Sequence, residues 1–257
     1  MRDILLVTKG HPYEREPFYN IFDEMEGVDW THVEHPAAQL HFDPEQTGRY
    51  DAYVMYDMPG ISFSPPQTPV FHEPDRDYKK NFMAMLEAGQ GMVFLHHAIA
   101  GWPAWPEYAD VLGGRFLYLP SELRGEPRQD SGYRHGVTHE VGVVTEHPIT
   151  AGVPETFEIT DELYLYEVFE DDVTPLLRSH HDFQDDRGFY SASKAVHGEM
   201  FSNENWEHEP GSNLVGWCKT HGASRIAYLQ CGDDGIAYAN PHFRRLIKNA
   251  IEWVSSS

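Results

Sequence analysis

The 257-residue chain is strongly acidic, with 19 lysines and arginines against 41 aspartates and glutamates and a formal net charge of -22. Such a charge repels nucleic-acid phosphates and anionic lipid headgroups, so neither nucleic acid nor a membrane surface is an expected partner. The only two cysteines, Cys218 and Cys231, are too few for a disulfide framework. No apolar run is long enough to span a bilayer and no leader pattern begins the chain, which predicts a cytoplasmic protein.

A single domain is expected over residues 1–257. No Ser/Gly run, long charge block, low-complexity tract or internal repeat divides the chain. The proline-rich stretch Ser62–Glu73 predicts a loop within that domain. The 16 histidines favour a site built from imidazoles, because histidine changes its protonation state near neutral pH.

The N-terminal segment predicts alternating strands and helices. Asp3–Thr8 is a compact apolar run, which predicts a strand, and the apolar residues between Phe18 and Met25 recur at helical spacing. Further strands are predicted at Trp30–Glu34 and Tyr50–Asp57, where aromatic and β-branched residues suit a packed sheet. This alternation is typical of an α/β fold, and it places His11 in the loop after the first strand.

A buried strand that runs into two histidines is the most informative feature of the sequence. The predicted helix Tyr78–Ala88 is followed by four apolar residues, Met92–Leu95, and then by His96 and His97. Ligands of parallel sheets bind outside the carboxyl ends of the strands, so both histidines and His11 are expected in one layer. Either histidine taken alone could instead be a packing residue.

Aromatic and turn-forming residues follow this strand. Trp102 and Trp105 could line a pocket or pack in the core, since aromatic faces do both. A short helix is predicted at Tyr108–Leu112. Arg115–Gly136 is polar and turn-rich, and Val137–Val144 resumes a strand pattern.

Two adjacent carboxylates, Asp161 and Glu162, follow the predicted strand Phe157–Thr160. At a strand end, one carboxylate could take a proton while its neighbour accepts a structural hydrogen bond. A turn cap beside a solvated neighbour is the alternative interpretation. The later strands are predicted at Thr174–Ser179, Asn213–Trp217 and Ser224–Gln230, and a helix is expected to begin after Asn240.

Several of these segments, taken in order, resemble the ThuA-like trehalose-utilisation family. The segments are Leu95–Ala98, Tyr108–Phe116, Glu146–Thr150, Asp161–Tyr164, Pro175–Arg178, Arg225–Gln230, Asn240–Phe243 and Asn249–Trp253. The resemblance covers essentially the whole chain. It implies a three-layer α/β sandwich with a mostly parallel central sheet, similar to flavodoxin-like folds and to class I glutamine amidotransferases.

In those amidotransferases the strand-to-helix elbow carries a cysteine nucleophile, whereas this chain carries histidines there. Cys218 lies within one predicted strand and Cys231 follows another, so cysteine hydrolase chemistry is disfavoured and both cysteines are expected to be packing residues. The resemblance implies a role in sugar catabolism, in which related enzymes oxidise a disaccharide to its 3-keto form. A C3 carbonyl acidifies the C2 proton, so a base could abstract it, the glycosidic oxygen could leave, and water could add back.

The resemblance therefore suggests general acid and base residues. His97 or Glu162 is the expected base. His96 or His11 is the expected electrophilic or leaving-group partner, and Asp161 is expected to orient a histidine. The family usually has Gly-His after the last strand, where this chain has Cys231-Gly-Asp-Asp, so Asp233 is the expected substitute for that histidine.

The candidate substrate-binding residues are Trp102, Trp105, Tyr164, Gln230 and Asp233. No cofactor is expected, although a divalent metal held by His11, His96 and His97 is the main mechanistic rival. A carbohydrate-binding or regulatory protein without catalysis is the rival from another class, because fold alone does not establish activity. The expected partner is a small sugar, and a homodimer is the expected assembly.

Overall fold

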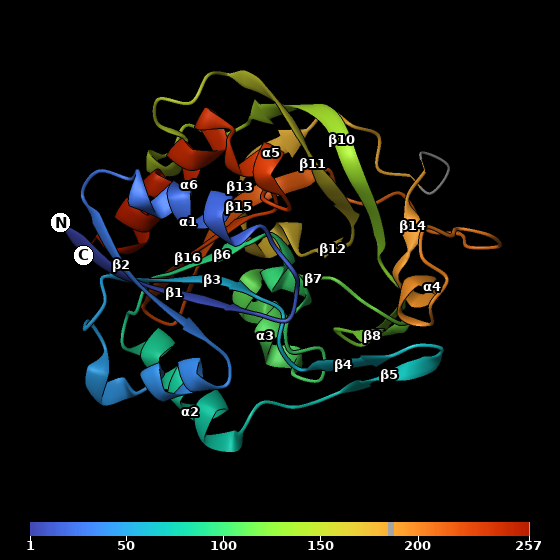
Figure 1. The fold of residues 1–257 in the computed structure, drawn as a ribbon, viewed down its shortest axis with the longest axis horizontal. Coiled ribbons are helices and arrows are strands. Elements are labelled where there is room, and N and C mark those ends of the chain that lie inside the picture. Colours follow the sequence, from blue (N-terminus) through green and yellow to red (C-terminus); the bar gives the residue numbers. More distant parts are fainter. Residues whose placement is uncertain (185–187, 257) are drawn as a thin grey trace.

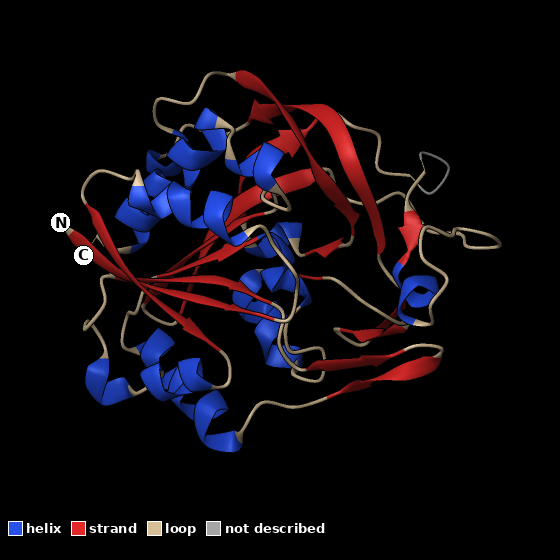
Figure 2. Ribbon diagram, viewed as in Figure 1, coloured by secondary structure: helices blue, strands red, loops and turns tan. Residues whose placement is uncertain are grey.

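The computed structural model describes residues 1–184 and 188–256, and it has a central sheet with helices on both faces (Figures 1 and 2). The sheet has ten strands in the spatial order β11-β10-β13-β15-β16-β6-β3-β1-β2, with β14 paired to β10. Their bounds are β1 (Arg2–Lys9), β2 (Val28–Glu34), β3 (Ala52–Asp57), β6 (Met92–Leu95), β10 (Gly132–Val143), β11 (Thr156–Leu165), β13 (Thr174–Ser179), β14 (Tyr190–Ser191), β15 (Leu214–His221) and β16 (Ser224–Leu229). The predicted three-layer α/β fold is confirmed.

Five neighbouring strands, β2, β1, β3, β6 and β16, are parallel, and the other pairings in this sheet are antiparallel. β3 and β6 are buried along their whole length, as strands covered on both faces must be, whereas β10 alternates between buried and exposed residues. The carboxyl ends of the parallel strands meet at one edge of the sheet. The candidate site lies at this edge.

The central sheet divides the core into two halves, one on each face. In β1, Ile4 and Leu6 pack with α1 (Arg15–Asp23) and α6 (Pro241–Val254). The alternate residues Leu5 and Val7 belong to the opposite cluster, because successive strand side chains point to opposite faces. That face is covered by α2 (Arg76–Glu87) and α3 (Pro106–Leu112). The short helix α5 (Gly235–Tyr238) lies beside α1 and α6 (Figure 1).

The predicted start of α6 at Asn240 is confirmed, since the Asn240 side chain accepts the backbone N–H groups of His242 and Phe243. The described residues also form five short 3-10 helices: η1 (Ala37–His41), η2 (Pro44–Gln46), η3 (His96–Ala100), η4 (Pro148–Thr150) and η5 (Glu170–Asp172). Among the described residues, none of the helices has the length and apolarity needed to cross a membrane.

Two predicted loop regions contain strands. The proline-rich stretch forms a hairpin of β4 (Ile61–Ser64) and β5 (Gln67–Phe71), and its prolines had hidden the strand pattern. The turn-rich stretch contains β7 (Gly114–Arg115), β8 (Ser121–Leu123), β9 (Glu126–Arg128) and the start of β10, and β7 pairs with β12 (Glu167–Val168). Figure 1 shows the β4–β5 hairpin, β8 and the short helix α4 (Ala192–Val196) together on the side away from both termini.

Candidate active site

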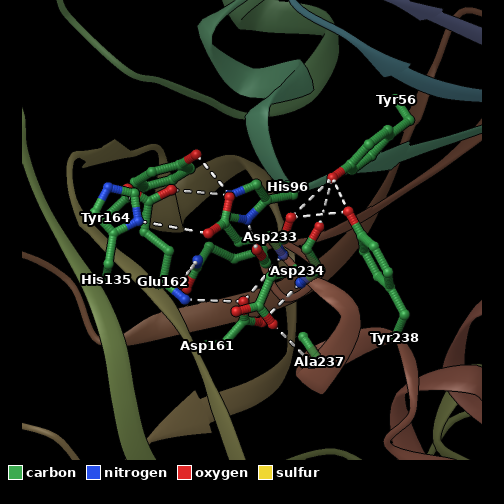
Figure 3. A network of polar contacts seen from close by, with 12 residues as sticks. Tyr56, His96, His135, Asp161, Glu162, Tyr164, Asp233, Asp234, Ala237 and Tyr238 are labelled. Atoms are coloured by element: carbon green, nitrogen blue, oxygen red, sulfur yellow. Dashed lines mark hydrogen bonds and ion pairs between the residues drawn. The ribbon is translucent and has the colours of Figure 1, made fainter. Parts of the chain in front are cut away.

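His96 is the first residue after β6 and has a left-handed backbone conformation, with φ of +46°. This region disfavours residues with a Cβ, and strained backbone of this kind is concentrated at functional sites. The side chain is fully buried and points toward β11 and the loop after β16 (Figure 3). The histidine elbow predicted from the sequence is therefore present.

The contacts of His96 indicate which of its ring nitrogens carry a hydrogen. Its Nδ1 lies 2.6 Å from the backbone carbonyl of Gln230, which can only accept, so Nδ1 carries a hydrogen. Its Nε2 lies 3.0 Å from Glu162 Oε2, 3.5 Å from Asp233 Oδ1 and 2.8 Å from the Tyr164 hydroxyl. Burial alone would lower the pKa of His96, but hydrogen bonds with Asp233 and Glu162 raise it well above its usual value. These contacts favour a protonated imidazole.

His135 completes the cluster from the other side. The register between β10 and β11 shifts between Arg134 and Val137, so His135 lies in a bulge opposite Glu162. Its Nδ1 is 3.4 Å from Glu162 Oε1 and 3.4 Å from Asp233 Oδ2. The hydrogen bond with Asp233 raises the pKa of His135. Each carboxylate thus lies between two histidines (Figure 3), and the His135 side chain, 41% exposed, can exchange protons with solvent.

Asp233 is the acidic centre of this arrangement. Burial would raise the pKa of Asp233, but hydrogen bonds from His135 and His96 hold it well below its usual value. The loop that carries it is fixed by two tyrosines: Tyr238 donates to the Asp233 carbonyl at 2.8 Å, and Tyr56 donates to the Gly232 carbonyl at 2.8 Å. The expected substitution at Asp233 therefore places a carboxylate between the two histidines.

Asp161 lies within β11 rather than at a strand end, so that part of the prediction was wrong. Its carboxylate accepts the backbone N–H groups of Glu162 at 2.9 Å, Gly232 at 2.7 Å and Asp233 at 3.0 Å. Burial raises the pKa of Asp161 to about 7, and these three donors oppose the rise. Asp161 thus ties β11 to the loop after β16, where it positions Asp233 rather than orienting a histidine directly.

His11 and His97 lie together, as predicted from the parallel strands, with ring centroids 4.8 Å apart. Their environments differ. His11 lines a cavity, and burial lowers its pKa. His97 packs against the Tyr56 ring at 4.2 Å and lies outside the cavity, where burial and the neighbouring His11 and His96 lower its pKa well below the usual value. This placement disfavours His97 as the base.

Three residues predicted to bind substrate lie in the core instead. Trp105 is almost fully buried, and Trp102 packs edge-on against His35 and at a tilt against Tyr78, beneath α2. Gln230 is fully buried, and its side-chain amide donates to the Glu162 carbonyl at 2.7 Å. Trp102, Trp105 and Gln230 are thus too buried to contact a ligand in the cavity, and Gln230 helps to place Glu162. Tyr164 is the predicted binding residue that does line the cavity.

A cavity of about 310 Å³ opens beside this cluster. Its lining residues are His11, Met58, Phe63, Pro65, Ala100, Phe116, Tyr118, Tyr133, His135, Glu162, Tyr164, Ala192, Ala195, Val196 and Met200. A mainly apolar pocket with a few converging polar groups is typical of small-molecule sites. Sequence reasoning missed Tyr133 and His135. Both lie at the start of β10, where alternate residues would indicate a strand, but Gly136, with φ of +64°, interrupts the pattern directly after His135.

The predicted metal ligands His11, His96 and His97 are not brought together around one point, because Nε2 of His96 turns to the carboxylates and His97 packs elsewhere. Within the described part of the chain, the ligand atoms that do converge belong to His96, Glu162 and Asp233, all within 4.8 Å of one another. One imidazole and two carboxylates suit a divalent ion. Protons on His96 and His135 would together balance the same two carboxylates.

Comparison with known proteins supports the fold and the family. The family model described as trehalose utilisation matches residues 4–254. A protein described as ThuA-like from Parabacteroides merdae is 15% identical, with 99% of this chain and 90% of that chain covered and a TM-score of 0.64. A second, from Bacteroides uniformis, is 18% identical, with 98% and 91% covered and the same TM-score.

A protein from Thermoplasma acidophilum that is described as part of a GMP synthase has the same fold, with 12% identity, a TM-score of 0.50, and 98% and 94% of the two chains covered. This likeness agrees with the expected amidotransferase-like architecture. No curated protein has a matching sequence. Because the family model spans nearly the whole sequence, the chain belongs to the ThuA family, described by trehalose utilisation.

Proposed function

We propose that the chain is an enzyme of sugar catabolism that cleaves a 3-keto glycoside by acid/base chemistry. The observation that carries the proposal is the Glu162 carboxylate, which faces the cavity between two histidines and is held from both sides. Such a group can accept and return a proton without a covalent intermediate. The family description, trehalose utilisation, supports a carbohydrate as the substrate.

In the proposed reaction Glu162 removes the C2 proton of the sugar, which the C3 carbonyl has made acidic. The electron pair forms a C1–C2 double bond as the glycosidic C1–O bond breaks, and the leaving oxygen takes a proton from His135. Water then adds its oxygen to C1 and gives one proton to His135, and Glu162 returns its proton to C2. The reaction consumes one water and releases the 3-keto sugar and the free alcohol.

The surrounding residues suit these roles. His135 has a raised pKa and access to solvent, so it can carry and replenish the proton given to the leaving oxygen. His11, kept neutral by burial, can donate an N–H to the oxyanion that develops on the C3 oxygen. His96 holds Glu162 in place and balances its charge, while Asp233 contacts His96 and His135 and holds both imidazoles; His96 and Asp233 are therefore positioning residues.

The cysteines do not favour a nucleophilic alternative. Burial raises the pKa of Cys218 to about 11, and Cys231 is buried with its pKa raised well above the usual value. A thiol in such surroundings is a poor nucleophile, because the thiolate is the reactive form. Both cysteines instead pack in the core.

To test the proposal, the protein is incubated with a 3-keto glycoside, and the rate at which the alcohol is released is measured. Glu162→Gln is expected to lower kcat about 100-fold or more, the usual contribution of a general base. Glu158→Gln is the matched control, because Glu158 lies on the same strand with its side chain exposed. Binding without turnover by the parent protein would favour the non-catalytic rival and contradict the proposal.

Two further predictions accompany this proposal, a cytoplasmic location and a homodimer. Size-exclusion chromatography with light scattering tests the second: a mass near twice the 29.5 kDa of one chain is expected, and a monomer would contradict it.

A further inference from the structure

The cavity has two chemically unlike parts. Its floor, next to the β10–β11 bulge and the β1 loop, carries the polar groups His11, His135 and Glu162. Its roof is apolar and comes from segments outside the central sheet: the β4–β5 hairpin supplies Phe63 and Pro65, and the region around α4 supplies Ala192, Ala195, Val196 and Met200.

The two roof segments are in contact with each other and with the cavity wall. Thr68 Oγ1 of β5 lies 3.3 Å from His197 Nε2 just after α4, and Phe63 packs edge-on against the Tyr118 ring at 5.9 Å. Phe63 and Met200 nevertheless keep 43% and 53% of their surface exposed. Large apolar side chains left open around a cavity mouth are typical of a ligand-binding surface.

The roof offers few partners for hydroxyl groups. Beside the roof, the Tyr133 hydroxyl accepts the Phe201 N–H at 3.0 Å, so it has only its own hydrogen left to donate. The Tyr118 hydroxyl is buried and has no hydrogen-bond partner. A second sugar ring placed against this roof would lose the water bound to most of its hydroxyls without replacing it, which is unfavourable. An aromatic or alkyl group would instead bury apolar surface, and one oxygen could accept the Tyr133 hydrogen.

We therefore propose that the substrate is a glycoside with an apolar aglycone, aryl or alkyl, rather than a disaccharide. The inference rests on the proposed function and specifies its substrate class. The keto sugar ring lies on the floor against Glu162, His135 and His11, and the aglycone lies against Phe63, Val196 and their neighbours. The glycosidic oxygen is then at the boundary of the two parts, within the reach of the group that protonates it.

Binding calorimetry with three probes tests this inference: the 3-keto derivatives of phenyl glucoside, methyl glucoside and trehalose. We measure binding to Glu162→Gln, which prevents turnover. The phenyl probe is expected to bind at least ten times more tightly than either of the other two. Trehalose-derived probe binding as tight as phenyl binding would overturn the inference.

Val196→Ser in the same background shortens the side chain slightly and adds a hydroxyl to the roof. It is expected to weaken the binding of the phenyl probe several-fold and to leave the binding of the methyl probe unchanged. An equal loss of affinity for both probes would contradict the inference. Phe63→Ser repeats the comparison from the exposed hairpin, where folding is least at risk. Turnover of the probes by the parent protein is a separate readout: tight phenyl binding without turnover rejects the catalytic proposal but not the apolar subsite.

Discussion

Replacing Asp161 tests whether the acidic loop after β16 is held by β11. In Asp161→Ala, three backbone N–H groups, those of Glu162, Gly232 and Asp233, lose their acceptor. A buried donor left without a partner costs about 1–3 kcal/mol, so the three together cost about 3–9 kcal/mol before water enters. Asp161→Asn keeps one oxygen, which can serve the two donors on Oδ1, and is expected to cost about 1–3 kcal/mol for the third.

Urea unfolding at pH 7 measures both variants, and Asp29→Ala, an exposed aspartate on β2, is the control with an expected change within about 0.5 kcal/mol. Turnover is expected to fall in parallel, because Asp233 loses its fixed position between His96 and His135. An Asp161→Ala protein that is destabilised by less than about 1 kcal/mol would refute this reasoning.

Three other predictions concern pH, backbone and metal. His139 is buried, and burial lowers its pKa to about 4, below the unfolded value of 6.5. The neutral imidazole therefore contributes up to about 3 kcal/mol to the free energy of unfolding, fully above pH 6.5, and this contribution is lost as the pH falls toward 4. Urea unfolding of the parent and His139→Asn should show a flatter pH slope in the variant, and equal slopes would contradict this. A Cβ on Gly10 would lie 2.0 Å from the Met58 carbonyl, so Gly10→Ala should lose at least about 1 kcal/mol more stability than Gly48→Ala, which shares a positive φ but has open space. Equal losses would refute the clash. Elemental analysis of untagged protein should find no stoichiometric divalent metal, because protons on His96 and His135 can balance the two carboxylates that they share, and a full equivalent of bound zinc or manganese would overturn this.

The elbow could be predicted from the sequence because its physical signal is local. Met92–Leu95 is apolar and short, and the polar residues follow at once, so His96 had to emerge at the carboxyl edge of a buried sheet. The same reasoning correctly predicted that His11 lies near His97. Such predictions need only the apolar pattern along each strand and the knowledge that neighbouring strands run parallel.

The rest of the site depends on long-range pairing that has no local signal. His135 reaches Glu162 only because β10 bulges where it crosses β11; parts of both strands were predicted, but neither their antiparallel pairing nor the bulge has a local signal. Trp102 and Trp105 were assigned equally to pocket or core, and the choice was decided by how α2 packs over them. Adjacent Asp161 and Glu162 point to different partners because strand side chains alternate, which separates a loop anchor from a cavity carboxylate.

Solvent deuterium exchange tests the central claim most directly. A 3-keto glucoside incubated in D2O with the protein is observed by proton NMR, which follows the C2 hydrogen independently of bond cleavage. The parent protein is expected to replace the C2 hydrogen by deuterium well above the uncatalysed rate, and Glu162→Gln is expected to abolish that excess. Exchange at the uncatalysed rate with the parent protein, or an undiminished rate in Glu162→Gln, would contradict the assignment of Glu162 as the base.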